Sequence, residues 1–362
     1  MMACRRRVRL ALALGIAALL ACSAPAAPTP ARPAATSPPA AASQPATAPA
    51  AAASPQTGPL HHMELGVVAL AAYFYPMWIA VEKGFYAQQG VDVALTTFQT
   101  NDSVAALVSG SLDVLHCPTD ACIIAVSKGA RLKLVNDYLM EAPYDLVAKP
   151  DLASVEELRG KKVGVSSLSA GSGTLAKVML RAKGLGPDDY ELVQAGGNPA
   201  RYAALQSGGI DAAMLSDPVN FAAQLEGYRV LLSFSDVVSQ YSFVSHWVQE
   251  SWLDDAANQG YLVAFQAGQI KANQWAHDAA NKDAVVDVIV RNAHTTPEIA
   301  QRIYDFYIVQ KPNVVDVSTL QTGPVQSVVS ILRDDEGLTG LPPDSQWKDG
   351  SYVARARQLV GQ

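Results

Sequence analysis

The sequence ALVSGSLDV at residues 106–114 returns 98 positions later as ALQSGGIDA at residues 204–212. At the same offset, LGV at 65–67 falls on VGV at 163–165. Two separate stretches that agree on one offset indicate an internal duplication rather than a chance match. We therefore predict two lobes that share one topology.

Short β-branched runs alternate with helical stretches from Glu64 onward, a pattern typical of parallel βαβ units in an α/β fold. In the first copy, the pattern predicts strands at 65–70, 91–98, 112–116 and 132–139, with helices near 76–87, 102–109 and 120–128. In the second copy, it predicts strands at 162–166, 191–194, 210–215 and 229–234, with helices from about 174, 200 and 218. The remainder reads as a helical C-terminal tail, in which Thr296-Pro297 is a typical helix start.

The chain is predicted to enter the second lobe near 148–152 and to return near 237–245. This division gives a first lobe of residues 60–148 plus 245–362 and a second lobe of residues 149–244. Two crossings between lobes are typical of a hinge with a cleft beside it.

The N-terminus has the features of an export signal, residues 1–21. Four arginines precede an apolar run, and the run ends in LLAC at 19–22, which resembles a bacterial lipobox. We predict lipidation of Cys22, and the alternative is ordinary cleavage at a nearby Ala-x-Ala site. Residues 22–59 are almost wholly Ala, Pro, Ser, Thr and Gln and are predicted to be a disordered tether. The folded part is therefore expected outside the cytoplasm, anchored to the cell membrane by its lipid.

The charge pattern argues against nucleic acid as a partner. The chain has 27 basic and 33 acidic side chains, a formal charge of −6, and no basic block interleaved with aromatic residues after the first ten positions. Removal of residues 1–21 takes away four arginines and no acids, which leaves a charge of −10.

No catalytic motif is present: the sequence has no Gly-x-Ser-x-Gly, His-Glu-x-x-His or Cys-x-x-Cys. We expect neither catalysis nor a cofactor. Cys117 and Cys122 fit two small buried residues, a disulfide, or a metal site that includes His116. No second ligand pair has metal-binding spacing, so we expect no metal.

Ligands of open parallel sheets bind beyond the carboxyl ends of the strands, at helix N-termini. The first such loop is aromatic in the first lobe and rich in glycine and serine in the second. We expect at least one of Tyr73, Phe74 and Tyr75 to form a wall of the ligand cleft, and we expect the fold not to require these three rings. The candidates from this pair of loops are Tyr73, Phe74, Tyr75, Trp78, Ser169, Gly171, Ser172, Gly173 and Thr174.

The other strand-end loops add polar candidates. Asp217 precedes Pro218, so it is either a helix N-cap or an acceptor for a ligand N–H. Tyr144, near the crossing, is either a lid or ordinary packing. The further candidates are Asn101, Thr119, Asp120 and Asn198.

The run YPMWIAVEKGFYAQQGVDV at 75–93 closely resembles the opening of the nitrate/sulfonate/taurine-type solute-binding proteins, which include relatives that bind thiamine-pyrimidine precursors. Further matches are Gly-x-Leu-Asp at 110–113, Leu-x-Gly-Lys-x-Val-Gly-Val at 158–165 and the element at 204–212.

This resemblance implies a type II periplasmic-binding-protein fold. It also implies a monomer that closes on a small molecule and delivers it to the permease of an ABC importer. We expect a flat heteroaromatic or a small organic anion: a pyrimidine precursor, a sulfonate or an aromatic acid. The alternatives are an enzyme of the pyrimidine-synthase branch, whose cysteine-rich signature is missing here, and a ligand-sensing lipoprotein that docks to a membrane receptor.

Overall fold

The computed structural model describes residues 59–68, 71–98, 100–168 and 171–362. The predicted signal peptide, nearly all of the predicted tether, Cys22, Ser169 and the side chain of Asn101 lie outside the described residues. None of the helices in the described residues combines the length and the apolar composition that a membrane span requires.

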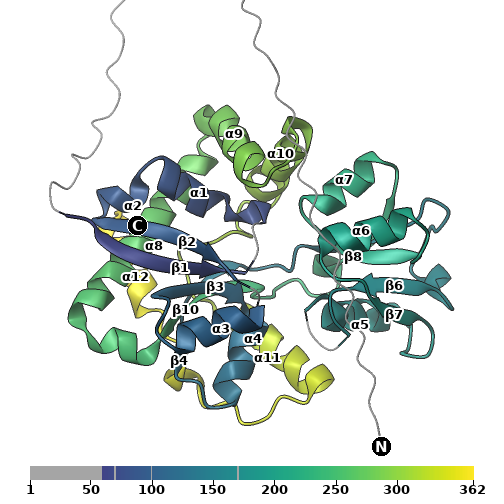
Figure 1. Cartoon of the computed structure of the whole chain (residues 1–362), viewed down its shortest axis with the longest axis horizontal. Coiled ribbons are helices and arrows are strands. Elements are labelled where there is room, and N and C mark those ends of the chain that lie inside the picture. Colours follow the sequence, from purple (N-terminus) through teal and green to yellow (C-terminus); the bar gives the residue numbers. More distant parts are fainter. Residues whose placement is uncertain (1–58, 69–70, 99, 169–170) are drawn as a thin grey trace, which may run out of the picture. The chain divides into compact units, whose positions relative to one another are not determined.

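The first lobe is built on a five-stranded sheet in the order β2-β1-β3-β10-β4 (Figure 1). Its β1, β2 and β3 are parallel, whereas β10 runs antiparallel to β3 and β4. The strands are β1 (His61–Val67), β2 (Val91–Thr97), β3 (Val114–Pro118), β4 (Leu132–Leu139) and β10 (Val244–Gln249). The helices among them are η1 (Ala72–Phe74), α1 (Tyr75–Glu82), α2 (Phe85–Gln88), α3 (Thr100–Val108) and α4 (Thr119–Ser127).

The second lobe repeats this plan in the order β7-β6-β8-β5-β9. Here β6 pairs in parallel with β7 and β8, and β5 runs antiparallel to β8 and β9. The α/β fold with two similar lobes is therefore confirmed. Its elements are β5 (Tyr144–Ala148), η2 (Glu156–Leu158), β6 (Lys162–Val165), α5 (Ser172–Ala182), β7 (Glu191–Gln194), α6 (Asn198–Gln206), β8 (Ala212–Ser216), α7 (Val219–Leu225), β9 (Arg229–Ser233) and η3 (Phe234–Asp236).

The position of β5 corrects the expected crossing at 148–152. The expected first lobe includes residues 144–148, but these residues form an inner strand of the second sheet, so the chain crosses between Leu139 and Tyr144. In each sheet, the strand that follows a crossing supplies the antiparallel partner, β5 in one and β10 in the other. The 98-residue offset could not reveal this exchange, because it aligns only the parallel units.

The helical tail belongs to the first lobe, where α8 packs on α1, α2 and α12. Thr296 caps α10 as expected, because its hydroxyl accepts a hydrogen bond from the Ile299 N–H at 3.3 Å. The tail consists of η4 (Glu250–Asp254), α8 (Ala256–His277), η5 (Ala279–Asn281), α9 (Lys282–Asn292), α10 (Pro297–Tyr304), the π-helical η6 (Asp305–Gln310), α11 (Thr322–Glu336), η7 (Asp344–Gln346) and α12 (Ser351–Leu359).

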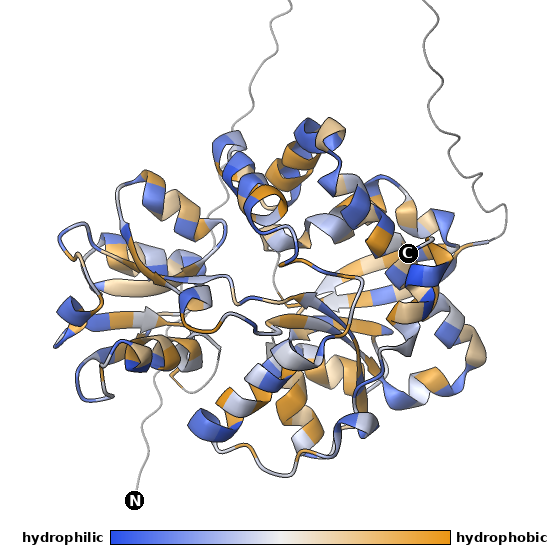
Figure 2. Ribbon diagram, turned by 180° about the vertical axis from the view of Figure 1, so that it is seen from behind, coloured by the Kyte–Doolittle hydropathy of each residue, from blue (hydrophilic) through white to orange (hydrophobic). Residues whose placement is uncertain are grey.

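Apolar residues follow the strands of both sheets, and hydrophilic residues are frequent on the surrounding helices and loops (Figure 2). Inside the first lobe, the Trp247 ring of β10 stacks on Trp347, with ring centroids 6.0 Å apart. Packing in the core of this lobe therefore connects β10, the last of its strands in the sequence, to the C-terminal segment.

A histidine pair lies inside the same lobe. His116 of β3 and His246 of β10 are cross-strand partners, and their ring nitrogens are 3.2 Å apart. The other ring nitrogen of His246 lies 2.6 Å from the side-chain oxygen of Asn136. Burial lowers the pKa of His246 to about 3, and burial together with His246 lowers the pKa of His116. Both rings are therefore neutral near pH 7.

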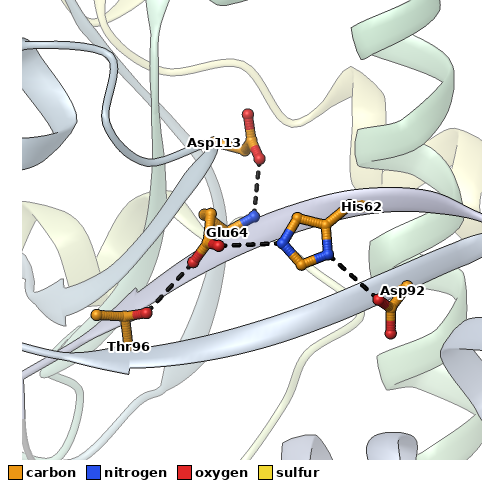
Figure 3. A network of polar contacts seen from close by, with 5 residues as sticks. All are labelled: His62, Glu64, Asp92, Thr96 and Asp113. Carbon is orange, nitrogen blue, oxygen red and sulfur yellow. Dashed lines mark hydrogen bonds and ion pairs between the residues drawn. The ribbon is translucent and has the colours of Figure 1, made fainter.

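The surface of the same sheet holds a different histidine. His62 of β1 bridges Glu64 at 3.0 Å and Asp92 of β2 at 3.2 Å (Figure 3). These two carboxylates raise the pKa of His62. Thr96 and Asp113 complete the network through the Glu64 side chain and backbone.

Candidate functional site

Asp217 follows β8 in the second lobe and accepts two hydrogen bonds from the first lobe. The Ala72 N–H donates at 3.0 Å, and the Tyr307 hydroxyl donates to the other carboxylate oxygen. Helix α7 begins at Val219 and receives no side-chain cap. The N-cap alternative for Asp217 is therefore wrong, and its carboxylate joins the two lobes.

Burial dominates the electrostatics of this junction. The Asp217 side chain is 3% exposed, and burial raises its pKa to about 6, although the Tyr307 hydroxyl and the Ala72 N–H oppose the rise. Burial also raises the pKa of Tyr307, and the nearby Asp217 charge adds to the effect. Because burial of a carboxylate costs free energy, Asp217 is a candidate for a functional residue.

A cavity of about 410 Å³ adjoins Asp217, and residues of both lobes line it. Its volume falls in the range of sites for small organic molecules. Four aromatic rings contribute to its wall: Tyr144 and Phe221 of the second lobe, and Phe306 and Tyr307 of the first. Phe221 and Phe306 also touch edge to face, with centroids 5.9 Å apart. The cavity therefore offers aromatic surface from both lobes.

Most charged groups of the wall already have partners. Asp145 accepts hydrogen bonds from the Asn220 amide at 2.8 Å and from the Ser233 hydroxyl at 2.6 Å. Lys311 pairs with Glu141 and lies 5.1 Å from the centroid of the Phe306 ring. Aromatic faces and fixed acceptors suit binding and orientation of a ligand.

A second set of contacts between the lobes connects α5 to α11. Arg181 forms a two-pronged ion pair with Asp335, one branch of which is 3.1 Å long. The Thr174 hydroxyl donates to Glu336 at 2.6 Å, and the Lys177 ammonium lies 3.9 Å from the same carboxylate. We call this set, Thr174, Lys177, Arg181, Asp335 and Glu336, the α5–α11 latch.

Of the predicted site residues, Tyr144 and Asp217 line the cavity. Tyr73 lies beside it, because its ring contacts that of Tyr307, with centroids 6.4 Å apart. Burial, together with the nearby Asp217 charge, raises the pKa of Tyr73. Burial raises the pKa of Tyr144, Arg201 opposes the rise, and the nearby Asp120 charge adds to it. These positions agree with the expected meeting of strand-end loops, and their contact with a ligand stays a prediction.

The positions of the aromatic rings in η1 and at the start of α1 contradict one expectation. Phe74 packs edge to face against Trp78, His116 and Tyr138, and the Tyr75 hydroxyl donates to Asn273 of α8 at 3.1 Å. Both rings, like that of Tyr73, belong to the main core of the first lobe. The expectation that the fold does not require them was wrong, because these rings pack in the core of the first lobe, and the described part of the second lobe has no counterpart of α8.

Several polar candidates are used within their own lobes. The Thr119 hydroxyl contacts Ser242 and Ser245 at 3.2 and 2.7 Å. The Ser172 hydroxyl accepts the Ser166 N–H at 2.8 Å. The Asn198 amide donates to the Ser216 hydroxyl at 2.6 Å. In this structure, the side chains of Thr119, Ser172 and Asn198 therefore stabilise loops within their own lobes.

Close packing explains why residue 173 is a glycine. An added Cβ at Gly173 would lie 1.9 Å from the Ser167 carbonyl oxygen. Gly173→Ala is expected to destabilise the protein by at least about 1 kcal/mol, because the adjoining backbone must move. Thermal unfolding checks this prediction. Gly260→Ala in α8 is the matched control, since no atom lies within 4 Å of its added Cβ and alanine favours a helix. Equal melting temperatures for the two variants would contradict the packing argument.

Residues that sequence reasoning missed come mainly from the tail and from α7. Phe306 and Tyr307 lie in η6, beyond the duplicated part of the chain, and Asn220 and Phe221 follow the predicted Asp217-Pro218. The Asp217-Pro218 dipeptide indicates that the following helix, α7, lies near the site. No local sequence pattern indicates that η6 does.

The duplicated sheets, the hinge segments and the cavity between the lobes define a protein of the periplasmic-binding class of folds. The NMT1/THI5 like family model matches residues 71–278, more than half of the chain, so the chain belongs to that family.

Three proteins with similar sequences carry different kinds of name. A Bacillus subtilis protein named only as a binding protein, YtlA, is 22% identical over 70% of this chain and 77% of its own. The riboflavin-binding protein RibY of Chloroflexus aurantiacus is 27% identical over 61% of this chain and 62% of its own. The pyrimidine phosphate synthase THI13 of Saccharomyces cerevisiae is 28% identical over 39% of this chain and 41% of its own.

Among solved structures, the alkanesulfonate-binding protein SsuA of Xanthomonas axonopodis, bound to MOPS, is similar with a TM-score of 0.63. It is 16% identical, and the match covers 81% of this chain and 100% of that one. At this identity, the likeness establishes the two-lobed fold alone.

Proposed function

We propose that this protein is an extracytoplasmic solute-binding lipoprotein that captures a small organic molecule between its lobes and delivers it to the permease of an ABC importer. The observation that carries the proposal is the cavity beside Asp217, which draws its wall from both lobes. A ligand there contacts both lobes at once and so favours their closed arrangement.

The ligand that fits best is a flat heteroaromatic compound with N–H or amino donors. Tyr144, Phe221, Phe306 and Tyr307 supply ring faces, and Asp217 supplies an acceptor. The name of RibY supports this class. A sulfonate or an aromatic acid is the second candidate, because the exposed Arg302 also lines the cavity.

Calorimetry with the purified full chain tests the ligand class. The panel contains a flavin, an aminopyrimidine, an aromatic carboxylate, an alkylsulfonate and nitrate. We expect one molecule per chain from the heteroaromatic group and weaker binding of the others. Tight binding of the alkylsulfonate without any heteroaromatic binding would overturn the ligand assignment.

An enzyme of the pyrimidine-synthase branch is the competing function, and the match to THI13 is the observation that favours it. The tyrosines, phenylalanines and paired carboxylates of the cavity wall suit holding a ligand. Mass spectrometry of the ligand after incubation separates the two functions. A binding protein returns its ligand unchanged, and a synthase yields product.

Anchoring through Cys22 and docking to an importer rest on the sequence. We expect a fatty-acid label to enter the wild-type chain and not Cys22→Ala. A ligand-sensing lipoprotein would carry the same label, so co-purification with a permease and an ATPase distinguishes transport from sensing.

The α5–α11 latch is expected to slow ligand release. Arg181→Ala removes a pair between the lobes in which the Arg181 side chain is exposed and the Asp335 side chain is nearly buried. Exposed pairs contribute about 0.2–1 kcal/mol, so ligand dissociation should become at least about 1.5-fold faster. Stopped-flow dissociation measures the rate. Arg159→Ala is the matched control because its partner, Asp189, lies in the same lobe. An equal acceleration in both variants would show that the latch does not act on closure.

A further inference from the structure

Two cysteines lie side by side in the first lobe. Cys117 is near the end of β3 and Cys122 is in α4, and both side chains are fully buried. Their Sγ atoms are 2.7 Å apart, whereas about 2.05 Å separates the sulfurs of a disulfide bond. A small displacement of the two thiols therefore brings them to bonding distance.

The surroundings favour a structural bond over a metal site or a reactive thiol. Both sulfurs lie in an apolar cluster with Leu107, Leu112 and Leu115. The His116 ring contacts His246, at 3.2 Å, and the ring of Phe74. Once formed, a bond in such a cluster is shielded from an attacking thiolate.

We propose that Cys117 and Cys122 form a disulfide in the mature protein, which ties the end of β3 to the first turns of α4. The four residues between them include Asp120, and burial together with this nearby carboxylate raises the pKa of Tyr241. The bond thus fixes the turn that carries Asp120 next to the interlobe region. The proposal rests on the extracytoplasmic location in the proposed function, because disulfides persist in oxidising compartments.

The bond forms by exchange with a disulfide such as oxidised glutathione. One cysteine thiolate attacks a glutathione sulfur and releases the first glutathione thiol. The second cysteine thiolate then attacks the mixed disulfide and releases the other glutathione thiol. The two cysteines are oxidised by two electrons, glutathione disulfide is reduced by two, and the two cysteine protons end on the released thiols. Because both sulfurs are buried in the folded state, exchange takes place during folding.

Peptide mapping of the refolded full chain tests the proposal. The reduced, denatured chain is refolded in a buffer of reduced and oxidised glutathione, free thiols are alkylated, and the chain is cut with trypsin. Cleavage after Lys83 and Lys128 leaves both cysteines on the single peptide 84–128. We expect this peptide to be lighter by two hydrogen atoms and free of alkyl groups, and to accept two alkyl groups after reduction. Two alkyl groups without reduction, or glutathione on either cysteine of the folded chain, would overturn the proposal.

Cys122→Ser is the control, because its peptide must carry an alkyl group or glutathione on Cys117 and can never show the lighter mass. The same peptide map of the natively purified chain measures whether the bond is already present before refolding. Refolding in glutathione does not depend on ligand or location. If the chain forms the bond but binds no compound of the panel, the proposed function is overturned and the disulfide proposal is supported. If the chain binds a compound but does not form the bond, only the disulfide proposal is overturned.

Discussion

Asp217→Asn is expected to make the protein more stable at pH 7.5 and to weaken its hold on ligand. The raised pKa of about 6 means that the buried carboxylate is less favourable in the folded chain than in the unfolded chain. A shift of roughly two pH units from the ordinary aspartate value corresponds to about 3 kcal/mol. Asparagine has the same shape without the charge, so much of this free energy is recovered.

The pH dependence gives the sign of the effect. Because the folded-state pKa of Asp217 lies above its unfolded value, its contribution to stability is fully present below about pH 4 and is lost as the pH rises through about 6. Urea unfolding of both proteins between pH 4 and 7.5 measures the difference. The advantage of Asp217→Asn should grow with pH across this range, and a constant difference would contradict the assigned cause.

Asp217→Ala is the matched variant for the interlobe contact. It removes the charge as well, but it leaves the Ala72 N–H and the Tyr307 hydroxyl without their acceptor. Each unpaired buried donor lowers the free energy of unfolding by about 1–3 kcal/mol. Asp217→Ala should therefore lack the gain in stability expected for Asp217→Asn. Equal stability of the two variants would show that the hydrogen bonds across the lobes contribute nothing.

His246→Gln is expected to make the protein resist acid. The folded-state pKa of His246 is about 3, below the ordinary value of 6.5, so its contribution to stability is present above pH 6.5 and is lost as the pH falls toward 3. Between pH 7.5 and 4.5, one such group accounts for about 3 kcal/mol. Glutamine does not titrate, and it can still contact the Asn136 side chain.

Urea unfolding at the two pH values measures this slope. Packing changes in His246→Gln can lower stability at both pH values, so the tested quantity is the difference between them. His62→Gln is the control from the exposed network, where nearby carboxylates raise the histidine pKa and the effect has the opposite sign. If His246→Gln keeps the full wild-type loss of stability on acidification, His246 is not the cause of that loss.

The repeated strand and helix units could be predicted because each depends on local sequence. Tyr75–Glu82 forms a helix with proline in its first turn, and Gly84 follows it with a positive φ of 71°, as local rules require. The exchange of β5 and β10 between lobes could not be predicted in this way, because an antiparallel strand in the fourth position has no local signature.

The candidate site shows the same limit. Asp217 was found from its place after a predicted strand, but its partner Tyr307 lies 90 residues further along the chain. The segment of Tyr73, Phe74 and Tyr75 corresponds to a loop of the second lobe that no equivalent of α8 covers in the described structure. Duplication therefore predicted the frame of each lobe, and the unduplicated tail determined which side chains are core and which line the cavity.

Native mass spectrometry of the full chain with the same ligand panel tests whether this protein binds a small molecule beside Asp217. We predict that one small organic molecule binds at one copy per chain, is released chemically unchanged, and is retained less well by Asp217→Ala. Conversion of the molecule into a product would show that the protein is not a binding protein, and equal binding by Asp217→Ala would show that the site lies elsewhere.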